Sequence, residues 1–223
     1  MLKLQVHAWT AITAIAGAIL LLIGTILHPM SADPNVPLAA FTEYAADTHW
    51  VASHLMQLSG MGLMVITLVL ISRQLMAGPA EGLAIVGAIG AVVSLAITAA
   101  LQAVDGIALK SMVNAWAKAP ENSKEMLFYA TFGVRQIEIG LASLMTLFLG
   151  ITIVIYGIAL LLAPRFPKAL GYVAIVGGIP TAIAGVVMAY TGFSDLAMMI
   201  NMPASLLLLI WISTLGIYVW RKS

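Results

Sequence analysis

The 223-residue sequence contains no cysteine. This absence excludes disulfides, thiolate metal sites, iron–sulfur clusters and covalent haem attachment. Charged residues make up only 9% of the chain, against about 25% in soluble domains. The net charge of +1 offers no electrostatic basis for holding a phosphate backbone, so we expect no nucleic-acid partner.

Two groups of catalytic motif are also missing. The sequence has no G-x-S-x-G nucleophile elbow, and no serine stands in an evident triad with a histidine and an acid, so it gives no support for acyl transfer. It also has no H-E-x-x-H or E-x-x-H spacing, which would place two metal ligands on one helix face. Any metal site must therefore be assembled from several helices.

Apolar residues, by contrast, are abundant. They make up 62% of the chain, and the mean hydropathy is +1.06. Six runs approach the roughly 20 residues that span a hydrocarbon core. They are Ala8–Leu27, His54–Met76, Leu83–Val104, Ile137–Ala163, Leu170–Tyr190 and Pro203–Trp220. We predict an all-α integral membrane protein, a single polytopic domain over residues 1–223 with six transmembrane helices bundled in the lipid bilayer.

The segments between these runs are not uniformly loop-like. Asp105–Gln136 contains two amphipathic stretches with helical spacing, separated by Pro120 and Asn122-Ser123. It predicts that the third and fourth spans continue outside the membrane as a helical hairpin. The first outer loop should contain a short helix around Leu38–Ala46. The hairpin is a candidate docking surface for other membrane subunits.

Charge asymmetry predicts the threading. With the N-terminus cytoplasmic, the inner connections and termini carry six basic residues and one acidic residue, and the outer ones carry four basic and eight acidic. We therefore expect both termini in the cytoplasm and the protein in the plasma (inner) membrane.

Small and polar residues form a stripe along each of the first five predicted spans, and these stripes should face one another in the bundle. Examples are Thr13 and Gly17 in the first span, Gly60 and Thr67 in the second, and Gly177 in the fifth. Each stripe ends at the outer face in an ionisable or strongly polar group. These groups are His28, His54, Gln57, Asp105, Arg135, Glu138 and Asp195. A charge inside the bilayer is costly unless it is paired or hydrated. We therefore expect an outward-facing polar pocket formed by spans one to five.

Simpler interpretations apply to the same residues. Polar groups at helix ends can lie among lipid headgroups, and His49 with Trp50 is typical of an anchor at the membrane surface. His28 precedes Pro29 and can simply terminate the first helix. Arg135 and Glu138 are spaced for a local ion pair.

The pocket favours binding of a small ligand, a metal or haem b. His54, Gln57, Asp105, Arg135, Glu138 and Asp195 are the candidate ligand-binding residues. His28, His54, Asp105 and Glu138 together offer two imidazoles and two carboxylates, a set that suits zinc, manganese or iron. His28 and His54 are alternatively the axial ligands of a haem, with Arg135 near its propionates. Two further hypotheses stay open: a non-catalytic accessory subunit or scaffold, and a proton- or cation-coupled transporter.

Overall fold

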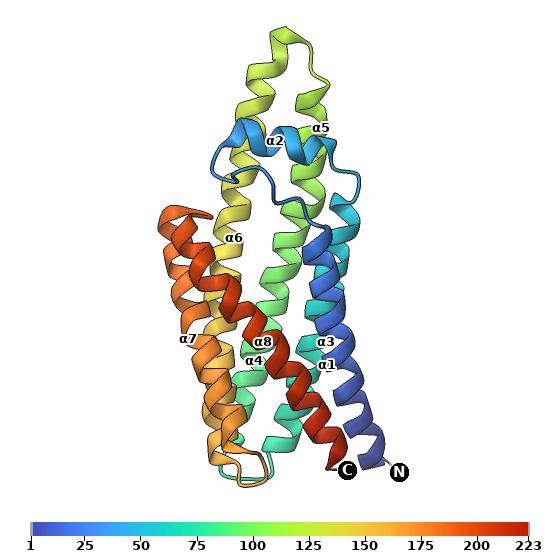
Figure 1. Ribbon diagram of the computed structural model, residues 1–223, viewed down its shortest axis with the longest axis vertical. Helices are drawn as coiled ribbons and strands as arrows, with labels where there is room; N and C mark the ends of the chain where they lie inside the picture. Colours follow the sequence, from blue (N-terminus) through green and yellow to red (C-terminus); the bar gives the residue numbers. More distant parts are fainter. Residues whose placement is uncertain (1, 223) are drawn as a thin grey trace.

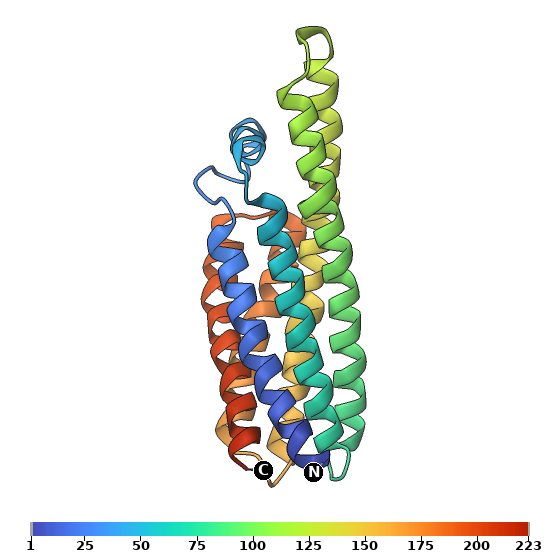
Figure 2. The same cartoon turned by 90° about the vertical axis from the view of Figure 1, so that its right-hand side faces the viewer.

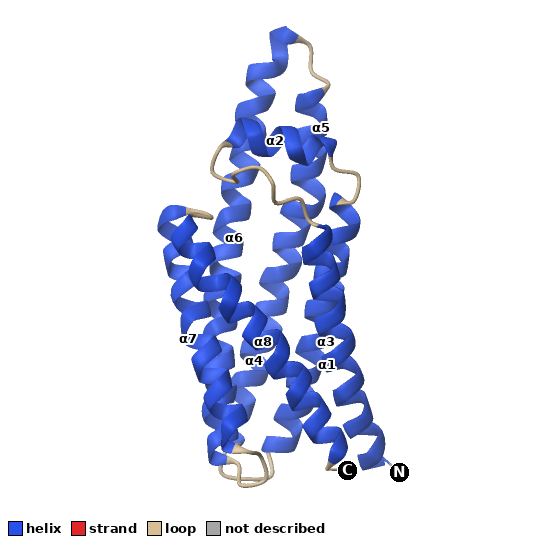
Figure 3. Ribbon diagram, viewed as in Figure 1, coloured by secondary structure: helices blue, strands red, loops and turns tan. Residues whose placement is uncertain are grey.

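The computed structural model describes residues 2–222, in which every regular element is a helix. Long rods run side by side along one axis, and short loops join them (Figures 1 and 3). The elements are α1 (Leu2–Leu27), α2 (Pro37–Ala46), α3 (Trp50–Leu75), α4 (Glu81–Gln102), the π-helix η1 (Ala103–Leu109), α5 (Lys110–Ala117), α6 (Glu121–Leu162), α7 (Lys168–Thr191) and α8 (Asp195–Arg221).

Six helices are long and apolar enough to cross a membrane, as the sequence predicts. They are α1, α3, the continuous α4–η1–α5 rod, α6, α7 and α8. Among the differences in bounds, α8 begins at Asp195, eight residues before the predicted start at Pro203, and α3 begins at Trp50, four residues before His54. The first turn of α3 is already closed, because the Ser53 amide donates to the His49 carbonyl at 2.8 Å. The chain is a multi-pass, all-helical membrane protein.

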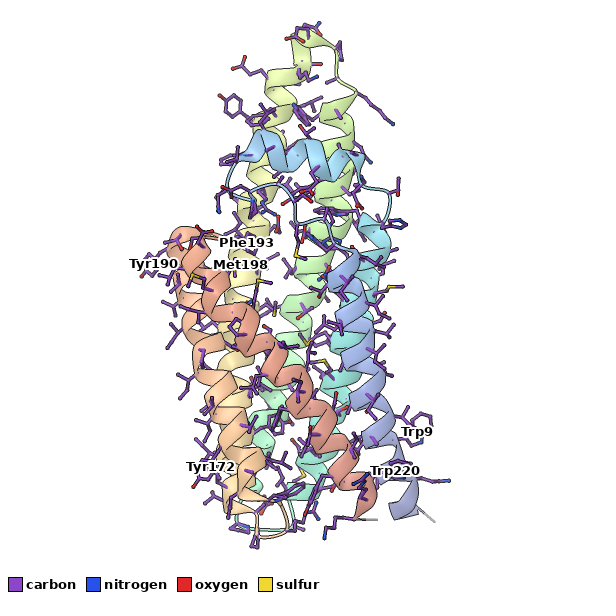
Figure 4. The ribbon with its side chains drawn as sticks, in the orientation of Figure 1. Trp9, Tyr172, Tyr190, Phe193, Met198 and Trp220 are labelled. Carbon is purple, nitrogen blue, oxygen red and sulfur yellow. The ribbon has the colours of Figure 1, made fainter. Side chains whose placement is uncertain are left out.

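Exposed aromatic side chains mark two levels along the bundle. Trp9, Tyr172 and Trp220 lie toward the end with the chain termini, and Tyr190 lies toward the other end (Figure 4). Tyr172 and Tyr190 are both on α7, so 18 residues of helix separate them by about 27 Å. This is close to the roughly 30 Å of a hydrocarbon core. Aromatic residues gather at membrane–water interfaces, so these two levels give a physical estimate of the membrane boundaries.

The helical hairpin predicted for residues 105–136 is present. Helix α6 has 42 residues and is therefore about 63 Å long, roughly twice the thickness of a bilayer core. Its first half pairs with α5 and projects beyond the ends of the other long helices (Figure 2). The predicted short helix is also present, as α2, which lies across the long axis beside this hairpin (Figures 1 and 2).

Small residues bring the long helices into backbone contact, as expected in membranes. On α1 and α3 the contact follows the predicted stripes. A Cβ added to Gly17 would lie 2.8 Å from the Gly60 carbonyl, and the hydroxyls of Thr13 and Thr67 are 2.8 Å apart.

Helices α6 and α7 pack through residues that recur at intervals of seven. Ser143, Gly150 and Gly157 on α6 meet Gly185, Gly178 and Gly171 on α7. The stripe predicted for α7, which includes Gly177, lies on a neighbouring face of that helix. There Gly177 contacts Leu208 of α8.

Both termini, the α3–α4 turn and the α6–α7 turn lie at one end of the bundle (Figures 1 and 2). Helix α2 and the α5–α6 hairpin lie at the other. Helix α8 crosses the bundle obliquely and packs against both α7 and α1 (Figure 1). The end with α2 is where the polar side chains of the candidate site meet.

Candidate metal centre

Three potential metal ligands converge beneath α2. One ligand atom each from His28, His54 and Asp105 can be chosen so that all three atoms lie within 4.8 Å of one another. The residues come from three elements: His28 follows α1, His54 is in the second turn of α3, and Asp105 is in η1. The structure thus assembles a site that no local sequence motif encodes.

The surroundings of His28 leave one imidazole nitrogen available as a ligand. Its Nδ1 lies 2.8 Å from the carbonyl of Pro29. A carbonyl can only accept, so Nδ1 carries the proton and Nε2 presents its lone pair. Burial lowers the pKa of His28, and the neighbouring His54 lowers it further. The imidazole is therefore neutral at pH 7, which is the form that binds a metal.

His54 repeats this arrangement. Its Nδ1 lies 2.6 Å from the Trp50 carbonyl one turn earlier and 3.3 Å from the Ser53 hydroxyl. Its Nε2 is 3.0 Å from Asp105 Oδ2, yet this buried nitrogen forms no aligned hydrogen bond with any described residue. Metal-ligating histidines usually donate their second ring N–H to a carbonyl or carboxylate. Both histidines of the cluster meet that condition.

Asp105 lies in a π-helix, an element that is rare and often found at functional sites. The Trp50 indole N–H donates to the Asp105 carbonyl at 3.0 Å, which holds this turn against the start of α3. The next residue, Gly106, is closely packed, because an added Cβ would lie 2.6 Å from the His54 Cβ. Only a glycine therefore lets η1 approach His54 this closely. Asp105 Oδ1 is buried and forms no hydrogen bond within the described part of the chain.

Aromatic side chains form one wall of the cluster. The Trp50 ring is 4.9 Å from that of His28, 4.6 Å from that of His54 and 4.4 Å from that of Tyr44. Tyr44 belongs to α2, and burial raises its pKa to about 12, so the phenol stays protonated. The Lys110 ammonium fixes α2 in place by donating to the carbonyls of Tyr44, Ala45 and Asp47 at 2.6–3.1 Å.

Arg135 and Glu138 form a buried ion pair on α6, beside the cluster. The distances from Arg135 Nη1 to the two carboxylate oxygens are 2.6 and 2.5 Å. This confirms the predicted pair, although its burial makes it very different from a surface pair. The Arg135 guanidinium also lies over the rings of Tyr44 and Phe193. Glu138 is close enough to Asp105 for their charges to interact, but it is not part of the three-ligand group.

Two predicted site residues lie apart from the three ligands. Gln57 accepts a 3.2 Å hydrogen bond from the side chain of Gln102, on α4, and is only partly buried. Asp195 is exposed at the first position of α8. Asp195 is not one of the three grouped ligands.

The cluster is only partly covered, because His28 and Asp105 are half-buried while the other charged groups are buried. His54 and Glu138 are 1% and 2% exposed, and Arg135 is 5% exposed.

The two residues predicted to anchor the chain at the membrane surface differ in exposure. His49 is exposed, but Trp50 is fully buried and connects His54 to Asp105. Sequence reasoning missed this role of Trp50 and the packing role of Gly106. The sequence did offer one signal for the role of Gly106, because an Asp-Gly pair stands inside an apolar run.

The geometry favours a metal ion over haem between the two histidines. Their ring centroids are 5.0 Å apart. The helices that carry them touch next to the cluster, where a Cβ added to Gly24 would lie 2.7 Å from the Ser53 carbonyl. A porphyrin between two axial imidazoles needs a slot between their helices, and this contact fills it.

No protein-family model, no curated protein and no solved structure matches the chain.

Proposed function

We propose that this multi-pass membrane protein binds a divalent transition metal through His28, His54 and Asp105 near one face of the bilayer. The observation that carries the proposal is the shared geometry of the two histidines. Each has its Nδ1 on a backbone carbonyl, and one ligand atom from each histidine lies with a carboxylate oxygen of Asp105 in a group of three within 4.8 Å. Two imidazoles and one carboxylate suit Zn²⁺ or Fe²⁺.

The number of ligands favours a reactive site over a purely structural one. Structural zinc sites are usually closed by four protein ligands, whereas catalytic sites combine three with a water or substrate. A metal held by His28, His54 and Asp105 has a further coordination position for water. The metal would lower the pKa of that water and make it a nucleophile. The buried neighbours Arg135 and Glu138 form an ion pair beside the three ligands.

The test is the metal content of the detergent-purified chain, measured by elemental analysis after loading with Zn²⁺ or Fe²⁺ and desalting. We expect about one ion per chain in the wild type, and loss of that ion in His28→Ala, His54→Ala and Asp105→Asn. Co²⁺ loading adds a second readout, because its visible absorption reports the coordination geometry. A wild type that stays metal-free in both assays would overturn the proposal.

Two matched controls guard against non-specific binding. His49→Ala removes an exposed histidine only five residues from His54, and Asp195→Asn removes an exposed carboxylate. Both variants should keep the full metal content. If they lose as much metal as the cluster variants, the binding does not belong to this site.

The accessory-subunit hypothesis is the main alternative. It is supported by the projecting hairpin (Figure 2), on which Met126 and Tyr129 are 67% and 64% exposed. A metal-free preparation that co-purifies with a stable partner would favour it. The transporter hypothesis has less support, because the cluster lies near the helix ends, whereas carriers hold their substrates near the bilayer midplane.

For orientation we propose that both termini are cytoplasmic, which would place the metal site at the outer face of the plasma membrane. The end with the termini carries Arg73, Arg165, Lys168, Arg221 and Lys222 near the ends of its helices, against Glu81, as the positive-inside rule requires. A reporter fused after the last residue should be active only on the cytoplasmic side. Activity on the opposite side would reverse the placement.

A further inference from the structure

A second polar site lies at the opposite end of the bundle, where the termini are. A cavity of about 300 Å³ opens there, among α1, α3, the α6–α7 turn and α8. Its lining includes His7, Gln74, Arg165, Tyr218 and Lys222 and contains no acidic residue. This volume is at the lower end of the range of about 300–1,000 Å³ that is typical of ligand sites.

Polar atoms at this cavity lack partners. His7 Nδ1 and Gln74 Nε2 are buried without a hydrogen bond to any described residue. A buried amide N–H₂ that donates to nothing costs free energy, and Gln74 can only donate through this atom. An acceptor inside the cavity would satisfy it.

The rim of the cavity is basic, and its Arg165 side chain is held in place. Arg165 donates to the Gln74 side-chain oxygen at 2.9 Å, and its guanidinium lies over the ring of Phe166. The Tyr218 hydroxyl donates to the Arg165 carbonyl at 2.7 Å, which joins α8 to the α6–α7 turn. Lys222 adds a second positive charge from the end of α8. The cavity thus combines the held guanidinium of Arg165 and the charge of Lys222 at its rim with an unpaired amide donor in its wall.

We infer that this cavity binds a phosphate group, with Arg165 and Lys222 pairing its negative charge and Gln74 donating to one of its oxygens. Basic pockets between transmembrane helices are known to take anionic lipid headgroups, and a guanidinium matches phosphate geometry. Trp9, Tyr172 and Trp220 lie at this end of the bundle (Figure 4), so the cavity is at headgroup level. A phosphate can reach it from an anionic phospholipid or from a soluble phosphoester. The inference does not depend on the metal site.

The first arm of the experiment tests the lipid source. The full chain is placed in nanodiscs of phosphatidylcholine with phosphatidylglycerol, and bound lipid is measured by native mass spectrometry after transfer to detergent. We expect retained phosphatidylglycerol, reduced about fivefold by Arg165→Gln or Lys222→Gln and more by the double variant, since each charge near the surface contributes modestly. The second arm adds glycerol 3-phosphate or inorganic phosphate to lipid-free protein and follows the unfolding temperature. A rise that Arg165→Gln abolishes identifies a soluble phosphoester as the ligand.

Arg73→Gln and Arg221→Gln are the matched controls. They remove exposed charges directly next to Gln74 and Lys222 in the sequence but outside the cavity lining, and they should keep wild-type binding. Size-exclusion profiles and helical circular dichroism confirm that each variant is folded. The inference is overturned if neither probe binds, or if the controls lose as much binding as the cavity variants.

Discussion

The indole N–H of Trp50 donates to the carbonyl of Asp105 at 3.0 Å. This bond connects the first residue of α3 to the π-helical turn that carries the only carboxylate of the metal cluster. The Trp50 carbonyl in turn accepts from His54. One buried tryptophan therefore positions two of the three proposed ligands, and it touches the third through its ring.

Trp50→Phe should weaken metal binding while keeping the aromatic wall. The change leaves the Asp105 carbonyl without its donor, which costs about 1–3 kcal/mol of stability. Metal affinity should fall about 10- to 100-fold, as for other groups that orient ligands. A competition titration with a metal chelator measures the affinity. Trp211→Phe is the control, because it loses an equivalent indole bond to the Leu170 carbonyl at 2.8 Å far from the site, and it should change stability alone. Equal affinity losses in both variants would contradict a positioning role for Trp50.

Gly106→Ala should displace His54. In a helix the exchange of Gly for Ala alone stabilises by about 1 kcal/mol, but here the new Cβ would meet the His54 Cβ at 2.6 Å. We expect lower metal affinity and an altered Co²⁺ spectrum. Gly133→Ala on α6 is the comparison, since no atom lies within 4 Å of its new Cβ, and it should be neutral or stabilising. An unchanged Co²⁺ spectrum in Gly106→Ala would mean that η1 moves freely and does not define the site.

Gly150→Ala should loosen the α6–α7 pair. The added Cβ would lie 2.7 Å from the Gly178 carbonyl, and the nearest atoms belong to the rigid backbone of α7. Overpacking of this kind costs about 1–3 kcal/mol. Thermal unfolding in detergent should show a lower midpoint than in Gly140→Ala, on the same helix, where an added Cβ has open space. A midpoint equal to that of Gly140→Ala would show that the two helices can separate without cost.

Glu138→Gln should separate stability from metal binding. The variant leaves the buried Arg135 charge unpaired, which costs about 3–5 kcal/mol. Replacing both residues with Met should recover most of that loss in a double-mutant cycle. Because Glu138 is outside the three-ligand group, the folded fraction of Glu138→Gln should still bind about one metal ion. Loss of the ion from well-folded Glu138→Gln would restore Glu138 as the fourth ligand that the sequence suggested.

Much of the fold follows from patterns that the sequence displays directly. Runs of apolar residues predict the six long helices, because only helices satisfy all their backbone groups in lipid. The turn at Pro120 predicts the hairpin of α5 and α6, and the small-residue stripe of Gly17 and Gly60 predicts the contact of α1 with α3. The residues that join α6 and α7 at intervals of seven are also visible in the sequence, but α7 has small residues on more than one face, and the predicted stripe with Gly177 was the wrong one.

For the candidate site, the sequence predicts the depth of the polar residues in the membrane but not which of them face one another. Depth in the membrane is a one-dimensional property, and counting residues from the helix ends places His28, His54, Asp105 and Glu138 at one level. Rotation about each helix axis is not settled by that count. Asp105 lies in the π-helix Ala103–Leu109, whose i→i+5 repeat departs from the α-helical one, so an α-helical count does not give the direction of its side chain.

The sequence by itself determined the membrane class, the six long helices, the hairpin and the level at which polar groups collect, since each depends on local hydropathy and spacing. The tertiary structure decided which of those groups meet. It joined His28, His54 and Asp105, left Asp195 exposed, and buried Trp50 against α2, η1 and α5. These outcomes depend on helix rotation and on backbone contacts at Gly24 and Gly106, which only the packing of helices against one another can fix.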